Sequence, residues 1–276
     1  KDFKGRAKVN SVELLVEDLE IQTTRSDVKL DLHYTYKEWL DYKSFISNVK
    51  MDYKLKNSTV HLKDVAFFAK GLNGLEEEVT ISGHVYGAVN SLNARDFRMT
   101  FGDKTLLEGD VDLDGLPNIR ETFVHINLKQ LETHYSDLIR VPLPPFTQEK
   151  RLKLPRYISN LGRVNFKGSF TGFVNDFVAY GKLNTAIGQV RTDISLKQDD
   201  TSAKLAYNGQ LQSFGFDVGK FLDEERIGKV TLDAKVTGKG LAKNDINAVL
   251  VGNVQSVELV GYDYRNVEVN GEFERS

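Results

Sequence analysis

Residues 79–87, VTISGHVYG, decide the fold class, because apolar and polar side chains alternate along them one by one. In an extended chain, Val79, Ile81 and Val85 point to one side and the polar residues between them point to the other. A period of two is typical of a strand with one buried face. The stretch therefore predicts a strand at residues 79–87.

The alternation recurs along almost the whole chain, in roughly fifteen segments separated by turn-forming residues. Helical patterns are few and short. We predict them at residues 37–48, 134–141, 155–161 and 217–222, the last with Asp217 as its N-cap. The sequence thus predicts an all-β protein, a long curled antiparallel sheet of repeated hairpins with a few short helices.

One internal repeat has the form apolar-x-small-x-apolar-x-Gly. It occurs as ISGHVYG at 81–87, FKGSFTG at 166–172 and LDAKVTG at 232–238. The spacings are irregular, which favours a degenerate hairpin repeat over a propeller blade or solenoid coil of fixed length. We interpret the glycines as bulges or bends that let a sheet curl.

A second pattern places an Asp or Asn between alternating apolar residues, at Asp18, Asp64, Asp96 and Asn266. These side chains could gather for calcium binding or acid–base chemistry. Their repetition in separate hairpins favours a structural role instead. We expect each to bond backbone at a strand kink or turn.

Composition excludes several classes of function. Among 276 residues there is no cysteine, and the formal net charge of −2 lacks the basic excess that nucleic-acid binding needs. Five scattered histidines show no metal-ligand spacing, and the common hydrolase and nucleotide motifs are missing. We expect neither an enzyme nor a nucleic-acid partner, and no metal or cofactor.

A proline-rich stretch, VPLPPFTQEKRLKLP at 141–155, interrupts the strand pattern. Proline lacks the N–H that a central strand donates, so this stretch cannot pair within a sheet. We predict a single elongated segment, 1–276, with a possible subdivision into 1–141 and 155–276 around a connector at 142–155. The chain is expected to be a middle piece of a longer polypeptide.

About fifteen strands exceed the roughly ten that an open twisted sheet usually reaches, so the sheet should curl, split or close. The apolar face then either packs on itself or lines a trough for an apolar ligand. The sequence leaves both states open. The residues predicted to line such a groove are Val79, Ile81, Val85, Phe97, Met99, Phe101, Val111, Leu113, Val164, Phe166, Phe170, Ile194, Leu232, Val236, Leu250, Val267, Val269 and Phe273.

Five blocks of the sequence, taken in order, resemble the TamB and AsmA-like proteins of Gram-negative envelopes. The most specific phrase is FTGFVNDFVAYGKLNTAIG at 170–188. The blocks are STVHLKDVAFF at 58–68, residues 79–119, LETHYSDL at 131–138, residues 161–197, and GYDYRNVEVNGEF at 261–273.

This resemblance implies an internal periplasmic segment of a protein whose inner-membrane anchor lies elsewhere in the chain. It also implies a folded-over sheet, the β-taco, with a hydrophobic groove. Family members are implicated in phospholipid transport between the inner and outer membranes and in assembling outer-membrane proteins. The implied partners are phospholipid acyl chains and, through other parts of the full chain, an outer-membrane barrel protein of the TamA or BamA type.

Two alternatives stay open at this point. One is a chaperone-like scaffold that pairs an exposed sheet edge with a client strand by β-augmentation. The other is a carbohydrate-binding or adhesin β-sandwich, in which the apolar faces pack together. Its binding residues would be exposed aromatic side chains such as Tyr86, Tyr180 and Tyr262.

Overall fold

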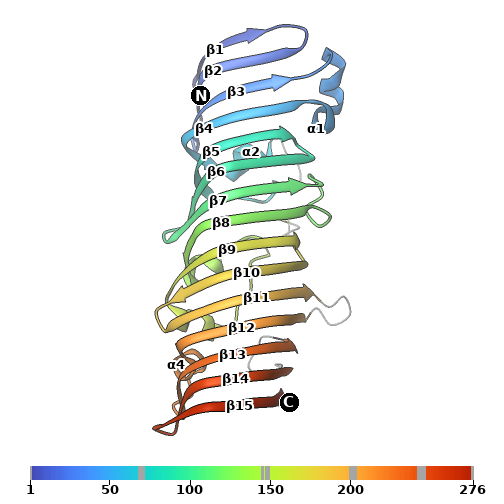
Figure 1. The fold of residues 1–276 in the computed structure, drawn as a ribbon. Helices are drawn as coiled ribbons and strands as arrows, with labels where there is room; N and C mark the ends of the chain where they lie inside the picture. The colour runs from blue at the N-terminus through green and yellow to red at the C-terminus, as the bar shows by residue number, and fades with distance from the viewer. Residues whose placement is uncertain are drawn as a thin grey trace. The chain divides into compact units, whose positions relative to one another are not determined.

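In a computed structural model, the chain forms one antiparallel sheet whose strand order follows the sequence (Figure 1). The structure describes residues 2–67, 72–143, 146, 150–198, 204–240 and 247–274, without the side chains of 273 and 274. Within these residues the strands are β1 Asp2–Val9, β2 Glu13–Gln22, β3 Asp27–Thr35, β4 Lys50–His61, β5 Glu78–Ala88, β6 Ser91–Phe101, β7 Thr105–Asp114, β8 Phe123–His134, β9 Arg163–Phe173, β10 Asp176–Thr185, β11 Gly188–Gln198, β12 Leu205–Asp217, β13 Ile227–Lys239, β14 Asn247–Leu259 and β15 Tyr262–Glu274.

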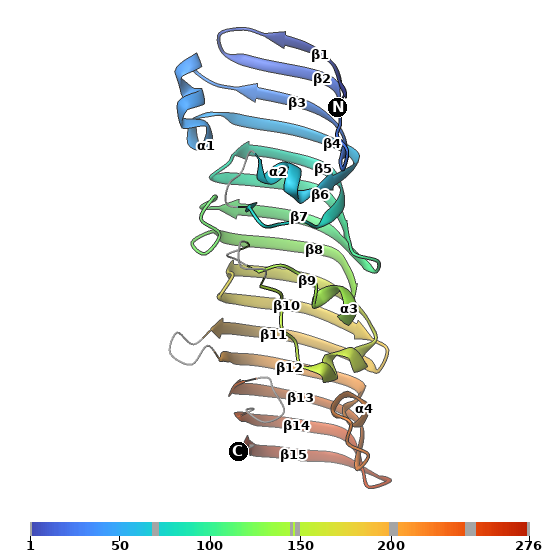
Figure 2. The same ribbon diagram turned by 180° about the vertical axis from the view of Figure 1, so that it is seen from behind.

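The strand order confirms the prediction of an all-β antiparallel sheet made of successive hairpins. The fifteen strands belong to one sheet, whereas the β-sandwich alternative requires two packed sheets. Carbohydrate binding, the function in that alternative, stays a prediction. β1 and β15 each have a single neighbour, so hydrogen bonding does not close the sheet. The predicted long curled sheet is confirmed only in part, because the sheet is open and not strongly curled within either compact unit defined next (Figure 2).

The chain divides into two compact units, each described by itself. The first unit contains Lys1–Gln130 and Arg140–Leu152, and the second contains Leu131–Ile139 and Lys153–Ser276. The chain passes from one unit to the other three times. One passage falls within β8, and the other two lie on either side of residues 140–152, which include most of the proline-rich stretch.

The helices are single turns or little more: η1 Trp39–Ser44, α1 Phe45–Asn48, α2 Leu62–Ala66, α3 Tyr135–Leu138, η4 Arg156–Leu161 and α4 Val218–Leu222. All but α2 fall within the four segments predicted to be helical. Asp217 caps α4 as predicted, because its side chain accepts a hydrogen bond from the backbone N–H of Lys220. α2 was missed.

Each unit has a small core where short helices pack on the apolar side of the strands. In the first unit, Val60, Val79 and Phe101 form a buried cluster, and Leu62 and Val65 of α2 pack against it. In the second unit, the buried cluster contains Leu161, Val164 and Phe216. The residues packed against it are Ile158, Leu183, Ile187, Val190, Val218 and Phe221.

Strand pairing in the first unit is interrupted along a line that runs from β1 to β6. Two residues of β2 are skipped between Val16 and Leu19, and two of β6 between Ala94 and Phe97. Such bulges bend a strand and increase its twist. Asp18 and Asp96 occupy these bulges with φ of 51° and 47°, a left-handed conformation that Asp tolerates better than most residues.

A period of four strands runs through the order of elements. A short helix follows every fourth strand: α2 after β4, α3 after β8 and α4 after β12. The glycine-ending sequence repeat lies in the first strand after each of these helices, namely β5, β9 and β13. The spacing of the repeat is therefore irregular when it is counted in residues but regular when it is counted in strands.

Candidate functional site

In the first unit, the predicted lining residues share one side of the sheet, which we call the apolar face. Residues that lie directly opposite each other on paired strands point to the same side. β7 continues the rows set by β5 and β6. The pairs are Val79 with Phe101, Ile81 with Met99, Val85 with Ala94, Phe97 with Gly109, Val111 with Ala94, and Leu113 with Leu92.

The second unit repeats this arrangement. One row crosses six strands in the order Phe170, Ala179, Ile194, Gly209, Val236 and Leu250. In neighbouring rows Phe166 pairs with Leu183, Leu232 with Val254, Val254 with Val267, and Val269 with Gly252. The backbone of Phe273 pairs with Ala248, and its side chain lies outside the described residues.

Burial differs along this face. Val79, Phe101 and Val164 are buried in the clusters on which the short helices pack, and Phe166 is buried as well. Farther along the strands, side chains such as Ile81, Val85, Phe97 and Phe170 are only half-buried. The apolar face is therefore partly covered by its own chain and partly open to whatever surrounds it.

Aromatic rings run from the buried to the half-buried part of the apolar face in the second unit. The ring centroids of Phe166 and Phe170 are 5.2 Å apart, and those of Phe170 and Phe177 are 6.0 Å apart. Gly168 and Gly181 lie opposite each other beside these rings, and a Cβ at Gly181 would come within 2.6 Å of Phe166 Cζ. Glycine at both positions leaves room for the end of the Phe166 ring over the paired strands.

The opposite side of the first unit carries charged side chains in two similar sets. The backbone N–H of Asp18 donates to Asp31, and the carboxylate of Asp18 pairs with Lys56 at 3.0 Å and with Arg6 at 2.7 Å. The hydrogen bond from Lys56, followed by that from Arg6, lowers the pKa of Asp18. These groups lie on neighbouring strands and hold the bulge in β2.

The second set repeats this geometry four strands later. The backbone N–H of Asp96 donates to Asp110, and Lys129 lies 2.6 Å from the carboxylate of Asp96, whose pKa it lowers. The prediction of a structural role at a kink holds for Asp18 and Asp96. The predicted contact was wrong, because at both bulges the backbone N–H bonds an aspartate of the next strand.

Asp64 plays another role. It lies in α2 and accepts hydrogen bonds from Thr23 at 2.8 Å, Ser26 at 2.7 Å and Arg25 at 2.7 Å. These three residues belong to the turn between β2 and β3, so the expected bond to backbone at a strand kink is not what Asp64 makes. The carboxylate of Asp64 therefore ties a helix to a turn.

Asn266, the fourth residue of the pattern, has a φ of 55° within β15.

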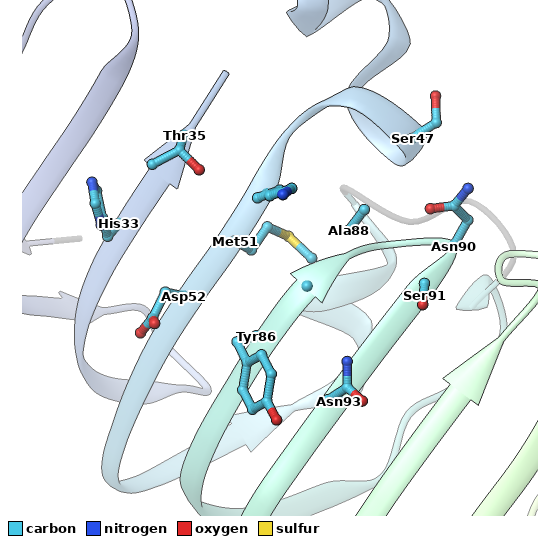
Figure 3. A pocket seen from close by; sticks show the side chains of 12 residues that line it. His33, Thr35, Ser47, Met51, Asp52, Tyr86, Ala88, Asn90, Ser91 and Asn93 are labelled. Atoms are coloured by element: carbon cyan, nitrogen blue, oxygen red, sulfur yellow. The ribbon is translucent and has the colours of Figure 1, made fainter. Parts of the chain in front are cut away.

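A polar cavity of about 660 Å³ lies at the ends of β3 to β6, on the side of the sheet away from the apolar face (Figure 3). Its floor is a row of directly opposed residues, His33, Asp52, Tyr86 and Asn93. We call it the polar pocket. Its other lining residues are Thr35, Ser47, Lys50, Met51, Gly87, Ala88, Asn90 and Ser91.

Two histidines at this pocket have carboxylate partners. His33 Nε2 lies 3.0 Å from Glu13, and this hydrogen bond lowers the pKa of Glu13. His84 Nε2, next to the pocket, lies 3.0 Å from Asp52. In the part of the chain that the structure describes, no group of three or more His, Asp or Glu side chains is placed to hold a metal ion.

A second cavity, of about 880 Å³, lies at η4 in the second unit. Lys153, Arg156, Tyr157 and Asn160 line it together with Asp223. The amide of Asn160 donates to the carboxylate of Asp223 at 3.1 Å.

Sequence reasoning missed the polar pocket, apart from naming Tyr86 as an exposed aromatic residue. Its floor residues come from four strands and are separated by as many as sixty positions, so no local pattern joins them. The signal that could have found it is the strand register, which sets these residues side by side.

Among the described helices, none is long and apolar enough to cross a membrane. No protein-family model, curated protein or solved structure matches the chain.

Proposed function

We propose that the apolar face shelters phospholipid acyl chains, and that the chain is a periplasmic segment of a TamB or AsmA-like envelope protein. The observation that supports this most is the unbroken row from Phe170 to Leu250 across six strands, with half-buried apolar side chains in it. An acyl chain is a long, uniform apolar ligand, and a long, uniform apolar strip is its natural complement. The headgroup stays in water.

The mechanism is passive. Burial of apolar surface contributes roughly 25 cal/mol per Å², or about 0.8 kcal/mol per methylene, so each acyl chain gains free energy along its whole length. Because the rows continue from strand to strand, a chain that slides by one strand exchanges one set of contacts for a similar one. An acyl chain that moves along the sheet therefore meets no deep free-energy minimum.

The finer form of the proposal is a β-taco, in which the sheet folds over the acyl chains to make a groove. The line of bulges from β1 to β6 supports it, because each bulge is a place where a strand bends. The short helices supply one wall in each unit, at the buried clusters. The lipid would occupy the half-buried remainder.

The test is native mass spectrometry with lipid extraction on the purified 276-residue chain, followed by lipid transfer between vesicles. Phospholipid should co-purify and be lost in the variants Phe170→Asp and Val85→Asp. Val178→Asp is the matched control, because Val178 is next to Ala179 on β10, faces the opposite side, and is 43% exposed. It should bind lipid as the unaltered chain does.

A lipid-free monomer, or equal lipid loss in Val178→Asp and Phe170→Asp, would contradict the proposal. The alternative is that the chain guides unfolded outer-membrane proteins at a sheet edge. In the 276-residue chain, β1 offers an edge for that test, because its eight residues are all exposed and it pairs on one side only. Under that alternative, client polypeptide rather than phospholipid would co-purify, and the charged variants of the apolar face would retain it.

A further inference from the structure

The polar pocket lies on the side of the sheet that the lipid proposal does not use. His33, Asp52, Tyr86 and Asn93 alternate with the residues of the apolar face along β3 to β6. Its volume of about 660 Å³ is within the range of roughly 300–1,000 Å³ that small-molecule sites occupy. The pocket is therefore large enough for a ligand of its own.

Several hydrogen-bonding groups in the pocket are available to a ligand. Within the residues that the structure describes, the hydroxyls of Thr35 and Tyr86 and the amide groups of Asn90 and Asn93 have no hydrogen-bond partner. Amides and hydroxyls both donate and accept hydrogen bonds. A ligand that also does both, with several such groups close together, is complementary to this lining.

The walls of the pocket are held in place by contacts outside it. The guanidinium of Arg95 lies 5.9 Å from the centroid of the Tyr86 ring and is itself paired with Asp112 at 2.6 Å. The ring of His84 lies 5.0 Å from that of Tyr86. At the rim, the backbone N–H of Asn90 donates to Ile46 of α1. Groups that are fixed in advance lose less entropy when a ligand binds.

The lining chemistry excludes other ligand classes in turn. Among the described residues that line it, Met51 and Ala88 are the only ones with an apolar, non-aromatic side chain, too few for an acyl chain. Lys50 is the only Lys or Arg among the described lining residues, so a phosphate group lacks the cluster of cations that it needs. What remains is a neutral ligand rich in hydroxyl groups, with a face that can lie against the Tyr86 ring.

We propose that the polar pocket binds a saccharide unit, with Asn90 and Asn93 bonding its hydroxyl groups and the Tyr86 ring packing against its apolar face. The inference does not depend on the lipid proposal, because the floor of the polar pocket and the apolar face lie on opposite sides of the sheet. An experiment can therefore contradict one of the two proposals without affecting the other.

The experiment is saturation-transfer NMR on the 276-residue chain with glucose, galactose, mannose and N-acetylglucosamine, and with glutamate and inorganic-phosphate competition as non-sugar probes. At least one sugar should show saturation transfer. Its affinity should fall at least tenfold in Asn93→Ala and in Tyr86→Ala. Tyr180→Ala is the control, because Tyr180 is a 62% exposed tyrosine of β10 far from the pocket residues in sequence and in the other unit.

Asn93→Ala is the decisive variant, since it removes a single unbonded amide and leaves the ring contacts of Tyr86 in place. A far-ultraviolet circular dichroism spectrum should show that each variant is folded. The proposal is overturned if no sugar gives a signal, if Asn93→Ala binds as tightly as the unaltered chain, or if phosphate or glutamate displaces the sugar.

Discussion

At the scale of single residues, glycine marks the places where two strands come closest. A Cβ at Gly209 of β12 would lie 2.0 Å from the carbonyl oxygen of Asp193 on β11, a separation that no real Cβ keeps. Gly215 of the same strand differs, because its φ is 54° and nothing lies within 4 Å of an added Cβ. Gly209 is required by contact, with a φ of 159° at the limit of the left-handed range, whereas Gly215 is required by backbone conformation alone.

The two glycines should therefore respond differently to alanine. Gly209→Ala should force β11 and β12 apart and lower the free energy of unfolding by about 2 kcal/mol or more. Gly215→Ala should cost about 1 kcal/mol, the usual penalty of a left-handed residue with a Cβ. Chemical denaturation followed by fluorescence measures both. Equal losses would show that the close approach at Gly209 relaxes without cost.

Residues also show what the sequence can predict. Alternation identified the strands and the side to which Val85 or Phe170 points, because a period of two is a property of neighbours in the chain. The partners of Asp18 and Asp96 could not be predicted, because Asp31 and Asp110 lie thirteen and fourteen positions away and meet them through register. The floor of the polar pocket was hidden for the same reason.

At the scale of elements, the short helices were the hardest to predict. α2 has five residues, fewer than the window of roughly eleven to eighteen in which helical periodicity can be read. What fixes it is tertiary: Leu62 and Val65 pack on the buried cluster, and Asp64 accepts hydrogen bonds from the turn between β2 and β3. α2 is therefore stabilised by its contacts with the sheet and the turn rather than by its own sequence pattern.

The attachment of α2 should depend on pH. Hydrogen bonds from Ser26, then Arg25 and Thr23, lower the pKa of Asp64 below its unfolded value of about 3.9. A lowered pKa contributes stability that is present above the unfolded value and is lost as the pH falls through the folded value. Asp64→Asn should therefore lower the melting temperature at pH 7.

The difference in melting temperature between Asp64→Asn and the unaltered chain should shrink as the pH falls below about 4. Asp103→Asn is a suitable control, because Asp103 is in an exposed turn with a side chain 86% exposed. A pH-independent difference for Asp64→Asn would mean that the charge of the carboxylate does not hold the helix.

At the scale of the whole molecule, the sheet is open, with an edge strand at each end. Protection against hydrogen exchange should therefore be lower in the edge strands than in the strands between them. β1 and β15 each pair on one side, and the described residues of both are almost all exposed. We expect their amides to exchange with deuterium well before those of β5, β6 or β11, each of which pairs on both sides. Mass spectrometry of peptic peptides measures this, and uniform protection from β1 to β15 would contradict it.

The four-strand period sets which changes of length such a protein tolerates. Loss of a single strand from an antiparallel meander reverses the direction of every strand after it and sends the following helix to the wrong edge. Loss or duplication of four strands preserves both chain direction and the position of the helix, and alters the reach of the sheet by about 19 Å. Evolution would therefore be expected to lengthen or shorten this protein in steps of one whole block.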